Sequence, residues 1–145
     1  VLPLHLNPRV RDKVLPEVAD LDNVIVTDPL PYDQFTKLMQ RSTLVLSDSG
    51  GVQEEAPSLG KPVLVMRENT ERPEAVTAGT VKLVGTVRRD IVDGVRELLD
   101  DAAAYDAMAT AVNPCGDGRA APRCVAAIAQ LLGVGERIAE FSAGR

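Results

Sequence analysis

The chain has 145 residues, of which 45% are hydrophobic and 26% are charged, a composition typical of a folded protein rather than a disordered one. Its net charge of −5 provides no overall basic field for nucleic acid or anionic lipid, so any anion that it binds must be held locally. No apolar run approaches the roughly 20 residues of a membrane span and no signal peptide is visible, so we expect a cytoplasmic protein.

Short apolar runs alternate with amphipathic segments along the chain. The apolar runs predict strands at residues 1–4, 24–26, 44–46, 63–66 and 80–84. Helices are predicted at residues 32–41, 52–59, 89–99, 101–112 and 119–132, and Pro73 is placed to begin a further short helix. Strands that alternate with helices form a parallel sheet covered on both faces, so the predicted fold class is α/β. Residues 1–4 have the pattern of a strand already under way, which indicates a piece of a longer protein.

The segment SDSGGVQEEAP, residues 47–57, lies where a predicted strand becomes a helix. In an open parallel sheet, ligands bind beyond the carboxyl ends of the strands. Gly50 and Gly51 let the backbone approach a ligand, and the first N–H groups of a helix lack intrahelical partners. Together with the positive end of the helix dipole, these groups predict a phosphate site. The alternative is a plain helix start, with Ser49 as N-cap and two glutamates favouring the dipole.

Two further side chains extend this site toward a nucleotide diphosphate. Glu55 lies one turn beyond Gly51 on the same helix face, about 6 Å along the axis, where its carboxylate could accept hydrogen bonds from ribose hydroxyls. Arg72, just before Pro73 in the loop after the next strand, could pair with the pyrophosphate. The alternative for Arg72 is an ion pair with Glu71 or Glu68 on a solvated loop.

Four other residues have chemistry to consider. Phe35 could stack on a base, although an aromatic side chain at a helical position is more often part of the core. His5 follows the first predicted strand and so faces the same crevice, as a structural residue or as a cleft residue. Cys115 and Cys124, with a single histidine in the chain, are too few and too poorly spaced for a zinc site, so we expect reduced thiols.

Residues 47–85, SDSGGVQEEAPSLGKPVLVMRENTERPEAVTAGTVKLVG, resemble the bacterial non-hydrolysing UDP-N-acetylglucosamine 2-epimerases, as do HLNPRVR before them and NPCGDGRA after them. The resemblance extends from Val1 to about Leu132. It implies the Rossmann-like carboxy-terminal half of a GT-B-like enzyme, with the substrate between the two halves. Such enzymes are soluble homodimers that interconvert UDP-N-acetylglucosamine and UDP-N-acetylmannosamine for surface polysaccharide synthesis, without a metal or nicotinamide cofactor.

The resemblance also implies roles for the residues already singled out. Ser49, Gly50 and Gly51 correspond to the diphosphate loop of the family, and Glu55 corresponds to its ribose-binding acid. Phe35 corresponds to the aromatic residue near the uracil, and Arg72 to the arginine on the phosphates. We therefore expect a UDP-sugar as the bound partner, with neither nucleic acid nor membrane.

The sequence departs from the family pattern in two ways. The acidic residues that handle the C2 proton, and a glycine-histidine-arginine segment, belong upstream of the residues present here. The catalytic groups are therefore unknown, and His5 is no more than a candidate cleft residue. Leu30 stands where some relatives carry a polar residue near the base.

The predicted organisation is a UDP-binding domain at residues 1–133 and a carboxy-terminal tail at residues 134–145, with an amino-terminal catalytic domain absent from this chain. We expect the chain to supply the UDP-binding half of the epimerase and to be inactive alone. The alternatives are the nucleotide-binding domain of a GT-B glycosyltransferase, a hydrolysing relative of the epimerases, and a non-catalytic module that binds nucleotide sugars.

Overall fold

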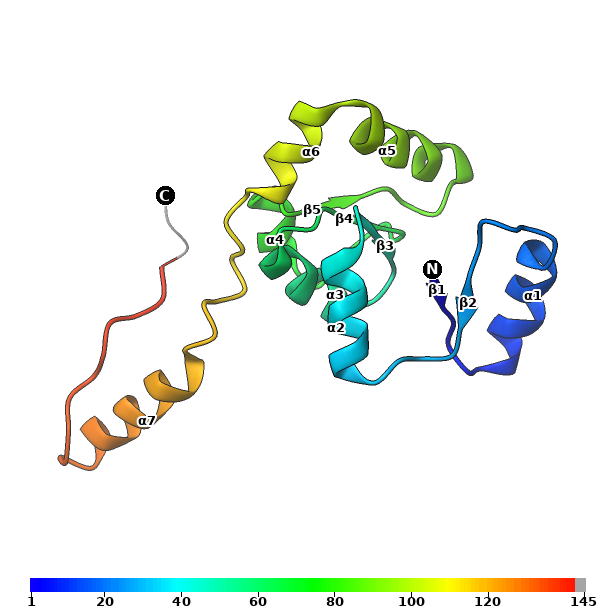
Figure 1. Cartoon of the computed structure of the whole chain (residues 1–145). Coiled ribbons are helices and arrows are strands. Elements are labelled where there is room, and N and C mark those ends of the chain that lie inside the picture. The colour runs from blue at the N-terminus through cyan, green and yellow to red at the C-terminus, as the bar shows by residue number, and fades with distance from the viewer. Residues whose placement is uncertain (143–145) are drawn as a thin grey trace. The chain divides into compact units, whose positions relative to one another are not determined.

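The computed structural model describes residues 1–142 (Figure 1). The chain forms two compact units, the first from Val1 to Arg41 and the second from Ser42 onward, and each is described by itself. Among the described residues, no helix has both the length and the apolar character needed to cross a bilayer.

The first unit contains two short strands and two helices. Strands β1 (Leu2–Pro3) and β2 (Val26–Thr27) pair in parallel, and helices α1 (Pro8–Val18) and α2 (Tyr32–Arg41) follow them in turn. Helix α1 was not among the predicted elements. Its start has a clear local cause, because the Asn7 side chain accepts a hydrogen bond from the Arg9 N–H at 3.0 Å, and Pro8 is tolerated at the first helical position.

The second unit is built on a three-stranded parallel sheet in the order β3-β4-β5. The strands are β3 (Val45–Ser47), β4 (Val63–Val65) and β5 (Val81–Leu83). The register pairs Ser47 with Val65 and Val65 with Leu83, so the carboxyl ends of all three strands lie along one edge. Every residue of β4 is fully buried, as expected for a central strand with both faces covered.

Helices cover the two faces of this sheet (Figure 1). On one face lie α5 (Arg88–Asp100) and α6 (Ala102–Ala109). On the other lie α3 (Gly50–Glu55), which continues as the 3₁₀ turn η1 (Ala56–Leu59), and α4 (Pro73–Thr77). The predicted α/β class is confirmed, and so is the short helix that begins at Pro73. The helix predicted at residues 52–59 begins two residues earlier and tightens to 3₁₀ geometry.

The core under α5 shows why that helix contains a glycine. Leu64, Val84 and Leu98 form the buried cluster between the sheet and the helix. A Cβ atom added to Gly94 would lie 2.9 Å from Cγ1 of Val84, closer than real side chains approach. Close contact between α5 and the sheet therefore depends on the absence of a side chain at residue 94.

The last helix, α7 (Ala120–Leu131), is fastened to its neighbours through Arg123. The guanidinium donates to both oxygens of the Asp117 carboxylate, at 2.6 and 2.8 Å, and to the Ala139 carbonyl at 3.0 Å. It also lies 5.9 Å from the ring centre of Phe141. Because Arg123 hydrogen-bonds the carboxylate, the pKa of Asp117 is held well below its usual range.

Candidate functional site

Helix α3 begins just beyond the carboxyl end of β3. Ser49 occupies the N-cap position in extended conformation, but its hydroxyl makes no capping hydrogen bond. Instead the hydroxyl of Ser47 accepts a hydrogen bond from the Ser49 N–H at 3.1 Å. Glu54 and Glu55 lie in the last turn of α3, and its first turn contains no acidic residue. Ser49 is thus the N-cap residue, as the plain helix start predicts, but its side chain does not cap α3 and the two glutamates do not lie at the positive end of the dipole.

Neither glycine at the start of α3 is required by the fold of the chain itself. Gly50 and Gly51 both lie outside the left-handed region of backbone conformation that favours glycine. A Cβ atom added to either would meet no atom of the described chain within 4 Å. Glycine in a helix is less stable than alanine by up to about 1 kcal/mol. The pair therefore costs helix stability without a packing reason, and it leaves open space beside the unpaired first N–H groups of α3.

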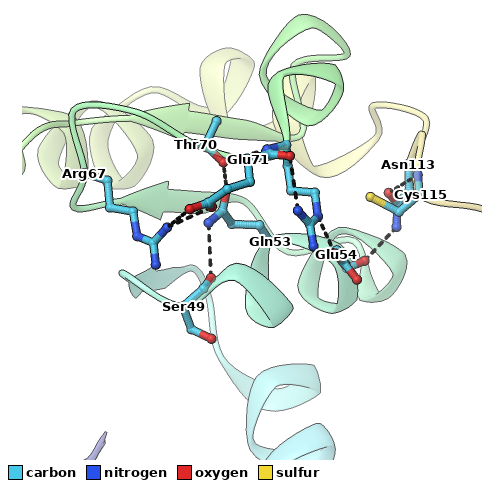
Figure 2. A network of polar contacts seen from close by, with 9 residues as sticks. Ser49, Gln53, Glu54, Arg67, Thr70, Glu71, Asn113 and Cys115 are labelled. Carbon is cyan, nitrogen blue, oxygen red and sulfur yellow. Dashed lines mark hydrogen bonds and ion pairs between the residues drawn. The ribbon is translucent and has the colours of Figure 1, made fainter.

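A buried amide connects α3 to the loop that follows β4 (Figure 2). The Gln53 side chain is completely buried, and its Nε2 donates to the Ser49 carbonyl at 3.2 Å. Its Oε1 accepts a hydrogen bond from the Thr70 hydroxyl at 2.5 Å. The Thr70 oxygen in turn accepts from the backbone N–H of Arg72 at 3.0 Å. Three hydrogen bonds thus lead from the residue before α3 to the residue before α4.

The Arg72 guanidinium is held by α3. Its Nε donates to the Glu54 carboxylate, and its Nη1 donates to the Glu71 carbonyl at 3.1 Å. The hydrogen bond that Arg72 donates to the Glu54 carboxylate raises the pKa of Arg72, which stays cationic. Nη2 makes no hydrogen bond within residues 1–142, and the side chain is 35% exposed. Two of its nitrogens are therefore held by atoms of the chain, while the third has no hydrogen-bond partner among residues 1–142.

The predicted alternative for Arg72, an ion pair with Glu71 or Glu68, is wrong. The Glu71 carboxylate pairs instead with Arg67, at 2.9 Å. Glu68 accepts a hydrogen bond from the Thr86 N–H at 3.2 Å. Both neighbouring acids thus have partners of their own, and the carboxylate that orients Arg72 comes from a helix eighteen residues earlier in the chain.

Unlike Glu54, Glu55 has no partner among residues 1–142. Its half-buried side chain makes no hydrogen bond or ion pair with any residue of the described chain. It lies four residues after Gly51, and side chains at this spacing share one side of a helix. A carboxylate in this position has its full capacity to accept hydrogen bonds from hydroxyl groups of a ligand.

Asn113 ties the chain after α6 to the end of α3. Its Nδ2 donates to the Glu54 carbonyl at 2.9 Å and to the Ser58 hydroxyl at 2.7 Å, while its Oδ1 accepts from the Cys115 N–H at 3.0 Å. Burial, with the carboxylates of Glu54 and Glu74, raises the pKa of the Cys115 thiol. Cys115 is therefore a poor nucleophile at neutral pH, and neither it nor Cys124 forms a disulfide.

Phe35 and His5 belong to the first unit. Phe35 lies in α2 with its side chain half-buried. His5 is exposed, and its Nδ1 accepts a hydrogen bond from the Asn7 N–H at 3.1 Å, which fixes the turn before α1. That these two residues share a crevice with α3 stays a prediction.

Comparison with known proteins places this geometry in a family. Residues 1–129 match the family model described as UDP-N-acetylglucosamine 2-epimerase. The chain belongs to this family. A UDP-N-acetylglucosamine 2-epimerase from Escherichia coli K12 is 57% identical over 128 residues, which are 88% of this chain and 34% of that relative. The chain therefore spans about a third of the length of such relatives.

Solved structures agree with this assignment. The S. aureus MnaA structure with UDP matches with a TM-score of 0.92 and 42% identity, over 97% of this chain and 39% of that one. An epimerase from Neisseria meningitidis bound to UDP-GlcNAc matches with a TM-score of 0.85 and 48% identity, over 88% of this chain and 34% of that one. The Rossmann-like α/β class, expected from the likeness to one half of a GT-B-like enzyme, is confirmed by these matches.

Proposed function

We propose that this chain is the UDP-binding part of a non-hydrolysing UDP-N-acetylglucosamine 2-epimerase, which interconverts UDP-N-acetylglucosamine and UDP-N-acetylmannosamine. The observation that carries the proposal is the tip of α3, where two glycines that packing does not require leave open space beside the first backbone N–H groups of the helix. Family membership makes a uridine nucleotide the ligand to expect there. UDP and UDP-GlcNAc in structures of two relatives support the same choice.

In this proposal the diphosphate and the ribose bind through groups of the second unit. The backbone N–H groups of Gly50 and Gly51, which follow Ser49 at the start of α3, bind the diphosphate. Nη2 of Arg72, in the loop after β4, binds it as well. Glu55 accepts hydrogen bonds from the ribose hydroxyls. The family resemblance makes Phe35 the residue proposed for the uracil.

The reaction proposed for the whole enzyme is an elimination followed by an addition. The bond between the sugar C1 and the UDP oxygen breaks as the C2 proton is removed, which gives a 2-acetamidoglucal and free UDP. Reprotonation of C2 on the opposite face and re-addition of UDP complete the epimerisation. Negative charge develops on the β-phosphate as UDP leaves, so Arg72 and the amides of α3 stabilise the transition state more than the ground state.

The residues of this chain thus act on the leaving group, and the acid and base groups that move the C2 proton are not assigned to it. A role in surface polysaccharide synthesis, cytoplasmic location and a homodimeric whole enzyme complete the proposal. They follow from the family resemblance rather than from a contact within the chain.

Isothermal titration of the chain with UDP tests the binding part of the proposal. We expect weak but saturable binding, and weaker binding of uridine, which has no phosphate for α3 and Arg72 to hold. Absence of heat at millimolar UDP would count against the proposal.

Product analysis with the whole enzyme tests the reaction. An epimerase forms UDP-N-acetylmannosamine without any acceptor, whereas a GT-B glycosyltransferase requires an acceptor for its transfer reaction. A hydrolysing relative releases free N-acetylmannosamine and UDP. Formation of the epimeric UDP-sugar alone is the expected result, and either of the other two products would contradict it.

A further inference from the structure

We infer that Gln53 and Thr70 are positioning residues that hold the tip of α3 and the guanidinium of Arg72 in a fixed relation before a diphosphate binds. The inference rests on the proposed function and adds two residues to its site. Neither is expected to contact the nucleotide, because the hydrogen-bonding groups of both are already used within the chain.

Because Gln53 is buried, the hydrogen bonds of its side chain are costly to break. The side chain has no exposed area, and both ends of its amide are bonded, Nε2 to the Ser49 carbonyl and Oε1 to the Thr70 hydroxyl. A buried amide that loses a partner leaves an unpaired polar group away from water, which is unfavourable. Movement of either α3 or the loop would break one of these bonds, so the amide keeps the two segments together.

Thr70 connects Gln53 to Arg72 through hydrogen bonds. Its hydroxyl donates to Gln53, and the same oxygen accepts from the Arg72 N–H at 3.0 Å. The Arg72 side chain returns to α3 through its ion pair with Glu54. The loop is therefore tied to α3 twice, through the backbone and through the side chain of one residue.

This double connection matters for binding because the two phosphate-binding elements come from different segments. A site whose groups are already in place loses less conformational freedom when the ligand binds, and its dipoles need no reorientation during the reaction. Without the Thr70 hydroxyl, Arg72 and the α3 amides would have to be ordered by the diphosphate itself. The loss of affinity should then be largest for ligands that contact both Arg72 and the α3 amides.

The test replaces Thr70 in the unsubstituted chain and measures UDP affinity by titration. Thr70→Val keeps the shape and removes the hydroxyl, and we expect about tenfold weaker UDP binding from the loss of its hydrogen bonds. Thr70→Ser restores the hydroxyl and should bind within about twofold of the unsubstituted chain. Thr77→Val is the matched control, because the Thr77 hydroxyl bonds only the Pro73 carbonyl of its own helix, at 3.0 Å. Its UDP affinity should not change.

A second readout separates positioning from a general loss of stability. Amide spectra of the free chain should change at Ser49 and Gly50 in Thr70→Val, although residue 70 lies on another segment. UMP, which lacks the β-phosphate, should lose less affinity than UDP. Gln53→Met breaks the same connection from the α3 side and should reproduce both effects if Thr70→Val does not fold.

The outcomes distinguish the two proposals. If the unsubstituted chain does not bind UDP, the proposed function and this inference fail together. If it binds UDP and Thr70→Val binds equally well, only the inference fails. Equal losses for UDP and UMP, without rescue by Thr70→Ser, would also overturn it.

Discussion

Two helices of the second unit contain glycine, for opposite reasons. In α5, a side chain at Gly94 would collide with Val84, so the packing of the helix on the sheet explains the residue completely. In α3, a side chain at Gly50 or Gly51 would meet no atom of the described chain. A glycine that the packing of the chain does not require indicates a contact with something outside the chain. For α3 we propose that this is a ligand which comes close to the backbone.

The surroundings of Gly94 and of the glycine pair in α3 differ in the same way. Gly94 lies among apolar side chains of the core, with Leu64 as its other close neighbour. The glycine pair of α3 instead precedes a buried glutamine and two carboxylates, one of which holds Arg72. Packing therefore dominates one region and polar preorganisation the other, so substitutions at the two should affect different properties.

The largest effect should come from Gly51→Ala. The added methyl group fills the space through which the diphosphate reaches the first N–H groups, and loss of hydrogen bonds to a charged ligand costs about 2 to 3 kcal/mol, or roughly 30- to 100-fold in UDP affinity. Thermal unfolding should show equal or higher stability, because alanine favours helix. Unchanged UDP affinity in a folded Gly51→Ala variant would remove the main support for the ligand site.

Gly94→Ala should lower stability and leave UDP affinity unchanged. Overpacking against Val84 is expected to lower the free energy of unfolding by about 1 to 3 kcal/mol, as measured by denaturant titration. UDP affinity of the folded variant should equal that of the unsubstituted chain, since α5, which contains residue 94, lies on the opposite face of the sheet from α3. A stable variant would show that α5 can move away from the sheet, and the contrast between the glycines would weaken.

Arg72→Gln should lower UDP affinity by about tenfold at low salt, because a charge-assisted hydrogen bond to the phosphates is lost. Arg67→Gln is its matched control. Both arginines follow β4 and pair with a glutamate, but Arg67 pairs with the exposed Glu71 of its own loop. Titration of both variants with UDP distinguishes a specific contact from a general effect of charge. Equal losses in the two variants would contradict the role of Arg72.

The smallest effect is expected for the ion pair between Arg123 and Asp117, which lies outside the proposed ligand site. Arg123 lowers the pKa of Asp117, so this pair contributes stability above the ordinary titration range of aspartate and loses it as pH falls through the lowered pKa. The protection factors of the α7 amides should therefore fall in acid, and Asp117→Asn should show that fall already at neutral pH. UDP affinity should not respond to this substitution. Protection of α7 that is independent of both pH and residue 117 would be inconsistent with the pair.

Local sequence patterns predicted most of the fold because each depends on neighbouring residues. The apolar run 63–66 predicted the buried central strand, and Pro73 predicted the start of α4. Helix α1 was missed although Asn7 and Pro8 give a recognisable start, since Pro16 interrupts its helical pattern. The tip of α3 was predicted from its glycines and its place after a strand.

The polar connections of the site could not be predicted in this way. Thr70 bonds Gln53 across seventeen positions and Arg72 bonds Glu54 across eighteen, and no local pattern specifies such pairs. A weak signal for Gln53 existed, because it lies three residues before Ala56, which is also buried, and a polar residue on a buried face must find partners. That Glu54 rather than another glutamate pairs with Arg72 became clear only from the structure.

The most direct test of the central claim is a titration of the isotopically labelled chain with UDP, observed through the backbone amides of its glycines. We expect concentration-dependent shifts at Gly50 and Gly51, where the diphosphate is proposed to bind, and none at Gly94, which serves as an internal reference in the same sample. Shifts at Gly94 alone, or no shifts at Gly50 and Gly51 at saturating UDP, would contradict it.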